Sequence, residues 1–159
     1  MTAHTFVVPG EPRGWERARA MATGKGVRFF TSPEQRARQG AIQWCAKAGG
    51  IVLAPEGEPI GVDVVASWLY PRAMSERKVR DELARLAASP AYLGLPKITR
   101  PDIDNAACKD VLDSLNGIAW HDDGQVAMMR AAKVWGPVAA TFVRLWTGDA
   151  PAFPMRWLT

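Results

Sequence analysis

The chain has 159 residues, a net charge of +4 and 48% hydrophobic residues, which suits one globular domain with its own core. No apolar stretch approaches the roughly 20 residues that span a bilayer, and the N-terminus lacks the features of a signal peptide. We therefore expect a cytoplasmic protein that does not engage a membrane. Cys45 and Cys108 form neither a disulfide framework nor a zinc pattern.

The first half of the chain predicts three strands and one helix. Ser32 can cap the helix, Pro33 suits its first position and Gln35 completes a capping box. The expected strands cover 5–8, 27–30 and 62–70, with a basic loop over 10–26. The helix is expected to end at the following glycine pair and to bury Ala37, Ala41, Trp44, Cys45 and Ala48.

The second half predicts two more helices and two strands. Ser75 caps a helix, and a third helix follows the acidic residues that begin at Asp102. Strands over 125–135 and 138–146 are joined most simply as a hairpin, and the tail from about residue 148 is irregular. The apolar face of the second helix comprises Val79, Leu83, Leu86 and Ala87. Together the elements predict one mixed α+β domain over residues 1–159, with a small mixed sheet and about three helices.

Two acids one residue apart precede the third helix. On an extended chain Asp102 and Asp104 point to the same side, where two carboxylates can bridge a hard cation such as Mg²⁺. The alternative is that Asp104 or Asn105 caps the helix, because capping residues are often acids or amides. Helix capping explains one of these residues but does not explain Asp102.

A lysine and a second acidic pair follow. Lys109 lies beside the apolar stripe of the helix, where it could bind a phosphate; alternatively it is an exposed lysine that pairs with Asp113. Asp122 and Asp123 precede a strand, and neighbours on an extended chain point to opposite faces, so we expect only one of the two to be a direct metal ligand. The alternative is an Asp-Asp-Gly turn.

The positive charge gathers away from these acids, as a binding path for a polyanion would require. Trp15, inside the first basic loop, is a candidate to stack on a base, with anchoring of the loop as the alternative, whereas Trp44, Trp68 and Trp146 fit core patterns. The candidate nucleic-acid-binding residues are Arg13, Arg17, Arg19 and Lys25 in the first quarter, and Arg72 and Lys78 further on.

Four segments, 6–19, 100–105, 111–117 and 122–126, give most of the chain a resemblance to the RusA family of Holliday junction resolvases, which phages often encode. The resemblance implies Mg²⁺, replaceable by Mn²⁺, at Asp102, Asp104 and Asp123, with Asp122 as neighbour or second ligand. It also implies that Lys109 is the essential lysine. One extra residue precedes that lysine, which turns an α-helix by about 100° unless a loop or bulge absorbs it.

The resemblance implies a magnesium-dependent endodeoxyribonuclease that resolves four-way junctions in DNA recombination and repair. Paired symmetric cuts in such a junction call for a symmetric or intertwined homodimer. Two other functions remain open: a non-catalytic nucleic-acid-binding module, and a metal nuclease that acts on flaps or forks.

Overall fold

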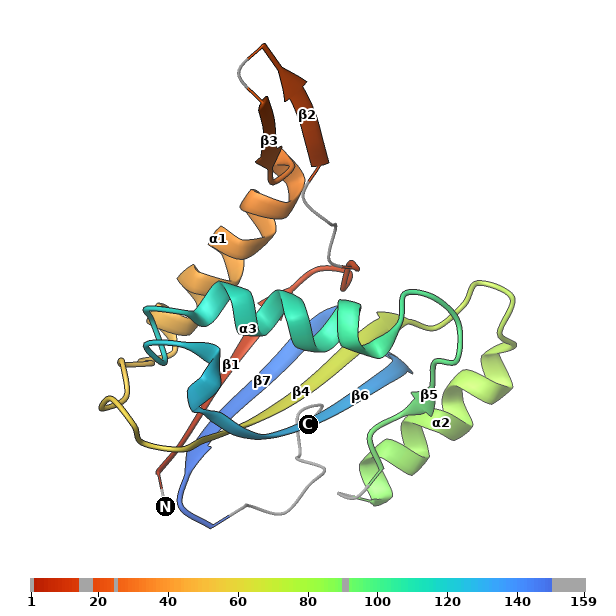
Figure 1. The fold of residues 1–159 in the computed structure, drawn as a ribbon. Helices are drawn as coiled ribbons and strands as arrows, with labels where there is room; N and C mark the ends of the chain where they lie inside the picture. Colours follow the sequence, from red (N-terminus) through yellow and green to blue (C-terminus); the bar gives the residue numbers. More distant parts are fainter. Residues whose placement is uncertain (1, 15–18, 25, 90–91, 150–159) are drawn as a thin grey trace.

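A computed structural model describes residues 2–14, 19–24, 26–89 and 92–149 of the chain, which form a mixed five-stranded sheet, three helices and a separate hairpin (Figure 1). The predicted α+β class is confirmed. The strands are β1 (Thr2–Pro9), β2 (Arg19–Thr23), β3 (Gly26–Phe30), β4 (Ile60–Leu69), β5 (Leu95–Pro96), β6 (Val126–Gly136) and β7 (Ala140–Thr147). The helices are α1 (Pro33–Ala48), α2 (Glu76–Ala88) and α3 (Asp110–Leu115), with a π-helical turn η1 (Asp104–Lys109) and a 3-10 turn η2 (Asp123–Gln125).

The central strand of the large sheet is β4. The strand order is β1-β7-β4-β6-β5, and β4 runs parallel to β6 and antiparallel to β7. The hairpin predicted from the last two strands is therefore wrong, because β4 lies between them. The reason lies in β4 itself, whose residues from Ile60 to Trp68 are all buried. A strand with no solvent-exposed face is stable where other strands and packed side chains surround it.

One face of the sheet carries the main core under α1 and α3. Ile42 and Ala46 of α1 and Val111 and Leu115 of α3 pack there against the sheet. The cap of α1 is confirmed, since the Ser32 hydroxyl accepts a hydrogen bond from the Gln35 amide. Its predicted apolar stripe is wrong except for Cys45: Ala37, Ala41 and Ala48 are exposed, and the Trp44 side chain is 72% exposed.

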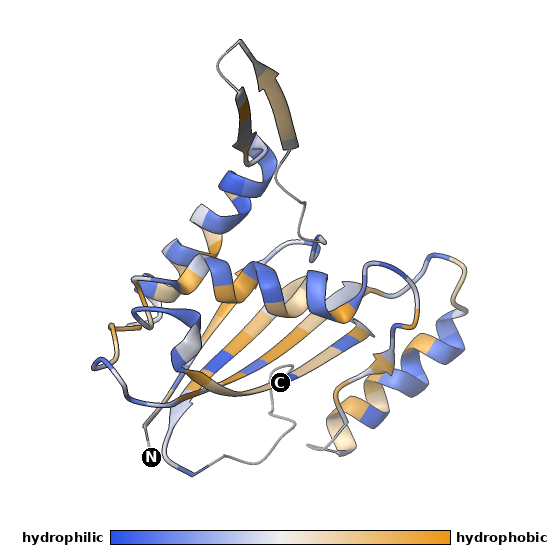
Figure 2. Cartoon of the chain, viewed as in Figure 1, coloured by the Kyte–Doolittle hydropathy of each residue, from blue (hydrophilic) through white to orange (hydrophobic). Residues whose placement is uncertain are grey.

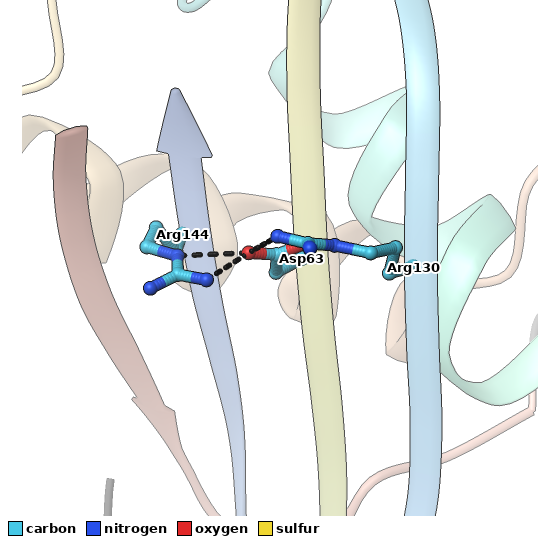
Figure 3. A network of polar contacts seen from close by, with 3 residues as sticks. All are labelled: Asp63, Arg130 and Arg144. Carbon is cyan, nitrogen blue, oxygen red and sulfur yellow. Dashed lines mark hydrogen bonds and ion pairs between the residues drawn. The ribbon is translucent and has the colours of Figure 1, made fainter. Parts of the chain in front are cut away.

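The opposite face of the sheet holds a buried carboxylate. Asp63 points away from the helices because its neighbours Val62 and Val64 belong to the main core. Its two oxygens accept hydrogen bonds of 2.5–2.8 Å from Arg130 on β6 and Arg144 on β7, so three adjacent strands are joined (Figure 3). A fully buried carboxylate is stable only with such charged partners.

Two peripheral elements extend beyond the sheet. Residues 19–23 form a strand, not the predicted loop, and pair with β3 in a hairpin that projects beyond α1 (Figure 1). Helix α2 lies beyond the β5 edge and is largely hydrophilic (Figure 2). Of its predicted apolar face, Val79 and Leu86 are half-buried while Leu83 and Ala87 are exposed. None of the helices within the described ranges is long and apolar enough to cross a membrane.

A buried polar network sets how α3 lies against α1. Asp110 is only 1% exposed. Its carboxylate accepts a 2.8 Å hydrogen bond from the Gln35 side chain and forms an ion pair with Arg38 at 3.0 Å. Arg38 also donates to the Thr141 hydroxyl on β7. The network therefore connects two helices and the sheet immediately after the π-helical turn.

We predict that Asp110→Ala lowers the free energy of unfolding by about 3 kcal/mol, because it leaves the guanidinium of Arg38 buried without its counter-charge. Urea unfolding followed by circular dichroism would measure the change. Trp44→Ala is the matched control and should shift stability by no more than about 0.5 kcal/mol, since its side chain is exposed. A loss below about 1 kcal/mol in the Asp110 variant would contradict a structural role for the network.

Candidate functional site

A cleft of about 870 Å³ opens where the first loop meets the segment before η1. Its walls combine carboxylates, basic side chains and two tryptophans, one each from β4 and β6. A cleft of this size and charge mixture can receive a phosphate backbone together with a cation. The lining residues are Glu11, Pro12, Arg13, Gly14, Trp68, Lys97, Arg100, Pro101, Asp102, Asn105 and Trp135.

The first acidic pair lies at and beside this cleft. Asp102 and Asn105 line it, and Asp104 begins η1 with an exposed side chain. Neither Asp102 nor Asp104 has a hydrogen bond or ion pair within the described part of the chain, and no side chain caps η1. The capping alternative therefore does not account for Asp104. Oxygen donors without protein partners suit a hard cation, so this donor set fits Mg²⁺.

The extra residue before the lysine coincides with the π-helical turn. From Asp104 to Lys109 the chain forms η1, and regular α-helix resumes at Asp110. A π-turn places residues i and i+5 one turn apart, as an α-helix does for i and i+4. The turn therefore absorbs one residue without rotating the rest of the helix, and Lys109 follows Asp104 by one turn with an exposed side chain.

The second acidic pair lies near the opposite end of β6. Asp122 accepts a hydrogen bond from the Gly124 amide, so this residue does form the turn proposed as its alternative, whereas Asp123 has no such partner among the described residues. The Pro101 carbonyl accepts a hydrogen bond from the Lys133 ammonium. Lys133 lies seven residues along β6 from Val126, which is roughly 23 Å of extended strand.

That separation has a direct consequence for metal binding. In the ranges that the structure covers, no three carboxylate, histidine or cysteine side chains come together as a potential metal site. The acids before η1 and those before β6 therefore do not form one cluster within a single chain. The sequence-based set of Asp102, Asp104, Asp122 and Asp123 remains a prediction.

The predicted DNA-binding residues fall in three places. Arg13 lines the cleft, and Arg72 and Lys78 are exposed at and beside the start of α2. The backbone of Arg19 begins β2. Trp15, Arg17 and Lys25 lie outside the described residues, as does most of the predicted irregular tail.

Sequence reasoning missed Glu11, Lys97 and Arg100 as cleft residues. Burial lowers the pKa of the Lys97 ammonium first, and the nearby Lys133 lowers it further, while Glu11 opposes the shift. Glu11 follows a turn, and Lys97 lies in a loop without hydrophobic periodicity, so neither residue carries a local sequence signal of function. Arg100 stands within the acidic run, and its charge beside two acids was the available signal.

Electrostatics near η1 also affect one thiol. Burial raises the pKa of Cys108, and the carboxylate of Asp104 raises it further. Burial likewise raises the pKa of Cys45, against the opposing charge of Arg38. Both thiols therefore stay protonated near neutral pH and are poor nucleophiles.

Comparison with known proteins identifies one family. The family model described as Endodeoxyribonuclease RusA matches residues 9–145 of the chain. The match spans the first loop, the cleft, η1 and both acidic pairs. A search of curated proteins found no match.

We predict that deletion of Ala106 converts η1 into a regular α-helical turn and leaves the domain folded, because Lys109 and all later residues keep their orientation. Thermal unfolding and far-UV circular dichroism would report the outcome. Deletion of Leu112 is the control: it lies in regular α-helix, rotates the buried Leu115 by about 100° and should unfold the domain. Equal damage from both deletions would show that η1 does not absorb the extra residue.

Proposed function

Because the chain belongs to the RusA endodeoxyribonuclease family, we propose that it resolves Holliday junctions by magnesium-dependent, paired hydrolysis of phosphodiester bonds. Membership of this family means that the chain is a hydrolase that acts on DNA. The family match therefore does not support the alternative of a non-catalytic binding module. The observation that carries the proposal is the cleft, where the Asp102 carboxylate, which has no hydrogen bond or ion pair among the described residues, stands beside basic side chains.

In this proposal the oxygen donors Asp102, Asp104 and Asp123 hold the ion, with Asp122 as neighbour. When bound, the ion lowers the pKa of a water molecule and neutralises charge at the phosphate, and Mn²⁺ can replace it. Arg13 and Arg100 attract the phosphate backbone to the cleft, since both are cleft residues with permanent positive charge.

Lys109 adds positive charge at the scissile phosphate. Its support is the π-helical turn, which keeps the lysine one turn after Asp104 despite the extra residue. Loss of such a charged donor typically costs on the order of 3 kcal/mol of transition-state stabilisation.

We also propose that the active form is a two-fold homodimer. A four-way junction has approximate two-fold symmetry and receives two cuts, which a two-fold pair of sites matches. The two acidic pairs of one chain lie near opposite ends of β6, so a site that uses both pairs draws them from two chains. Basic side chains of the first loop, together with Arg72 before α2 and Lys78 on α2, line the path of the DNA arms.

The wild-type protein is expected to cut a synthetic four-way junction in Mg²⁺ and to lose this activity when EDTA removes the ion. Asp104→Asn should lower the cleavage rate at least about 100-fold while junction binding persists, because metal contacts supply several kcal/mol to the reaction. Gel-based cleavage and binding assays measure both effects. Faster cutting of flaps or forks than of junctions would overturn the proposed substrate.

Mixing two inactive variants tests the shared site. If each site takes Asp104 from one chain and Asp123 from the other, a heterodimer of Asp104→Asn and Asp123→Asn contains one intact site and one doubly altered site. We predict that co-refolded mixtures nick junctions on one strand, whereas each variant alone does not. A mixture as inactive as its components would place all ligands in one chain. Wild-type protein refolded in the same way controls for recovery.

A further inference from the structure

Two lysines hold the backbone that precedes Asp102. The Lys97 ammonium donates to the Thr99 hydroxyl at 2.6 Å, to the Arg100 carbonyl at 2.5 Å and to the Thr99 carbonyl at 3.3 Å. The Lys133 ammonium donates to the Thr99 carbonyl at 2.7 Å and to the Pro101 carbonyl at 2.6 Å. Three consecutive carbonyls, ending one residue before Asp102, are thus bound by two ammonium groups.

Lys97 is buried to a degree that is rare for a lysine, with 6% of its surface exposed. Its ammonium lies 4.9 Å from the Trp68 ring centre and 4.7 Å from that of Trp135, between two aromatic faces that stabilise a cation. The ammonium therefore has both its hydrogen-bond acceptors and its aromatic partners supplied by the protein, which offsets the cost of burial.

The two lysines are also fixed relative to each other. The Lys97 amide donates to the Lys133 carbonyl at 2.9 Å, directly after the short β5–β6 pairing. Lys133 stands on β6, whose pairing with the central strand β4 makes it a rigid support. Among the described residues the β5–β6 pairing ends at Pro96, so the side chains of Lys97 and Lys133 hold the residues that lead to Asp102 against the sheet.

We propose that Lys97 and Lys133 form a clamp that fixes residues 99–101 and thereby sets where the Asp102 carboxylate stands in the cleft. Both are positioning residues: they act on the reaction through the backbone that precedes Asp102. The inference rests on the proposed function, because it assigns the clamp to the metal-binding carboxylate. A neutral side chain of similar length would fill the same space but would donate nothing to the three carbonyls.

Lys97→Met and Lys133→Met test the clamp, with Lys47→Met as the matched control, because Lys47 is an exposed lysine on α1, which lies away from β5 (Figure 1). Hydrogen exchange of the peptide covering 98–104 should accelerate in both clamp variants and not in the control. Mn²⁺ titration followed by electron paramagnetic resonance should show at least about a tenfold loss of affinity, as for other residues that orient metal ligands. Junction binding in EDTA should stay at the wild-type level.

A merely structural lysine would lower the unfolding temperature without these changes. Unchanged exchange in 98–104 together with wild-type Mn²⁺ affinity would overturn the clamp, even if the variants were less stable. If Lys97→Met fails to fold, Lys133→Met decides, because its side chain is only half-buried. If wild-type protein neither binds Mn²⁺ nor cuts junctions, the proposed function is refuted instead. The hydrogen-exchange rates of the two variants would then still show whether the lysines hold the loop.

Discussion

The position of β4 between β6 and β7 is the constraint on which the arrangement of the site depends. A parallel neighbour requires a long crossover, and here the crossover from β4 to β6 contains α2, the cleft segment, η1 and α3. Because β6 then runs alongside β4 in the same direction, the acids before β6 lie at one end of the sheet. The loop that carries Asp102 is tied to Lys133, towards the other end.

This arrangement gives the proposed homodimer a physical reason beyond the symmetry of the DNA. A hard cation needs several oxygen ligands, and the single chain offers its candidates in two separate groups. The strand pairing that separates them is extensive, so a hinge motion within one domain would have to break the sheet to join them. In the proposed homodimer, two chains would bring such groups together without disturbing either fold.

Local irregularity at the site is balanced by rigid surroundings. The π-helical turn at η1 departs from the regular helix, yet the ion pair between Asp110 and Arg38 fixes the helix immediately after it. On the other side, the clamp lysines hold the loop immediately before it. A buried ammonium and a buried carboxylate are each costly alone, and here both have their charge compensated on elements that the core already orders.

The sequence by itself determined what depends on neighbouring residues. The caps at Ser32 and Ser75, the ends of α1, the α+β class and the acidic motifs are local signals. Only the tertiary structure decided which strands pair, that Trp44 faces solvent, and that Glu11 and Lys97 share a cleft with Asp102. These outcomes join residues far apart in the chain, and hydrophobic periodicity does not specify which buried surfaces meet. The π-helical turn depends on both sequence and tertiary structure. The sequence has one residue more than the family pattern before Lys109, and only the structure shows that a π-turn absorbs it.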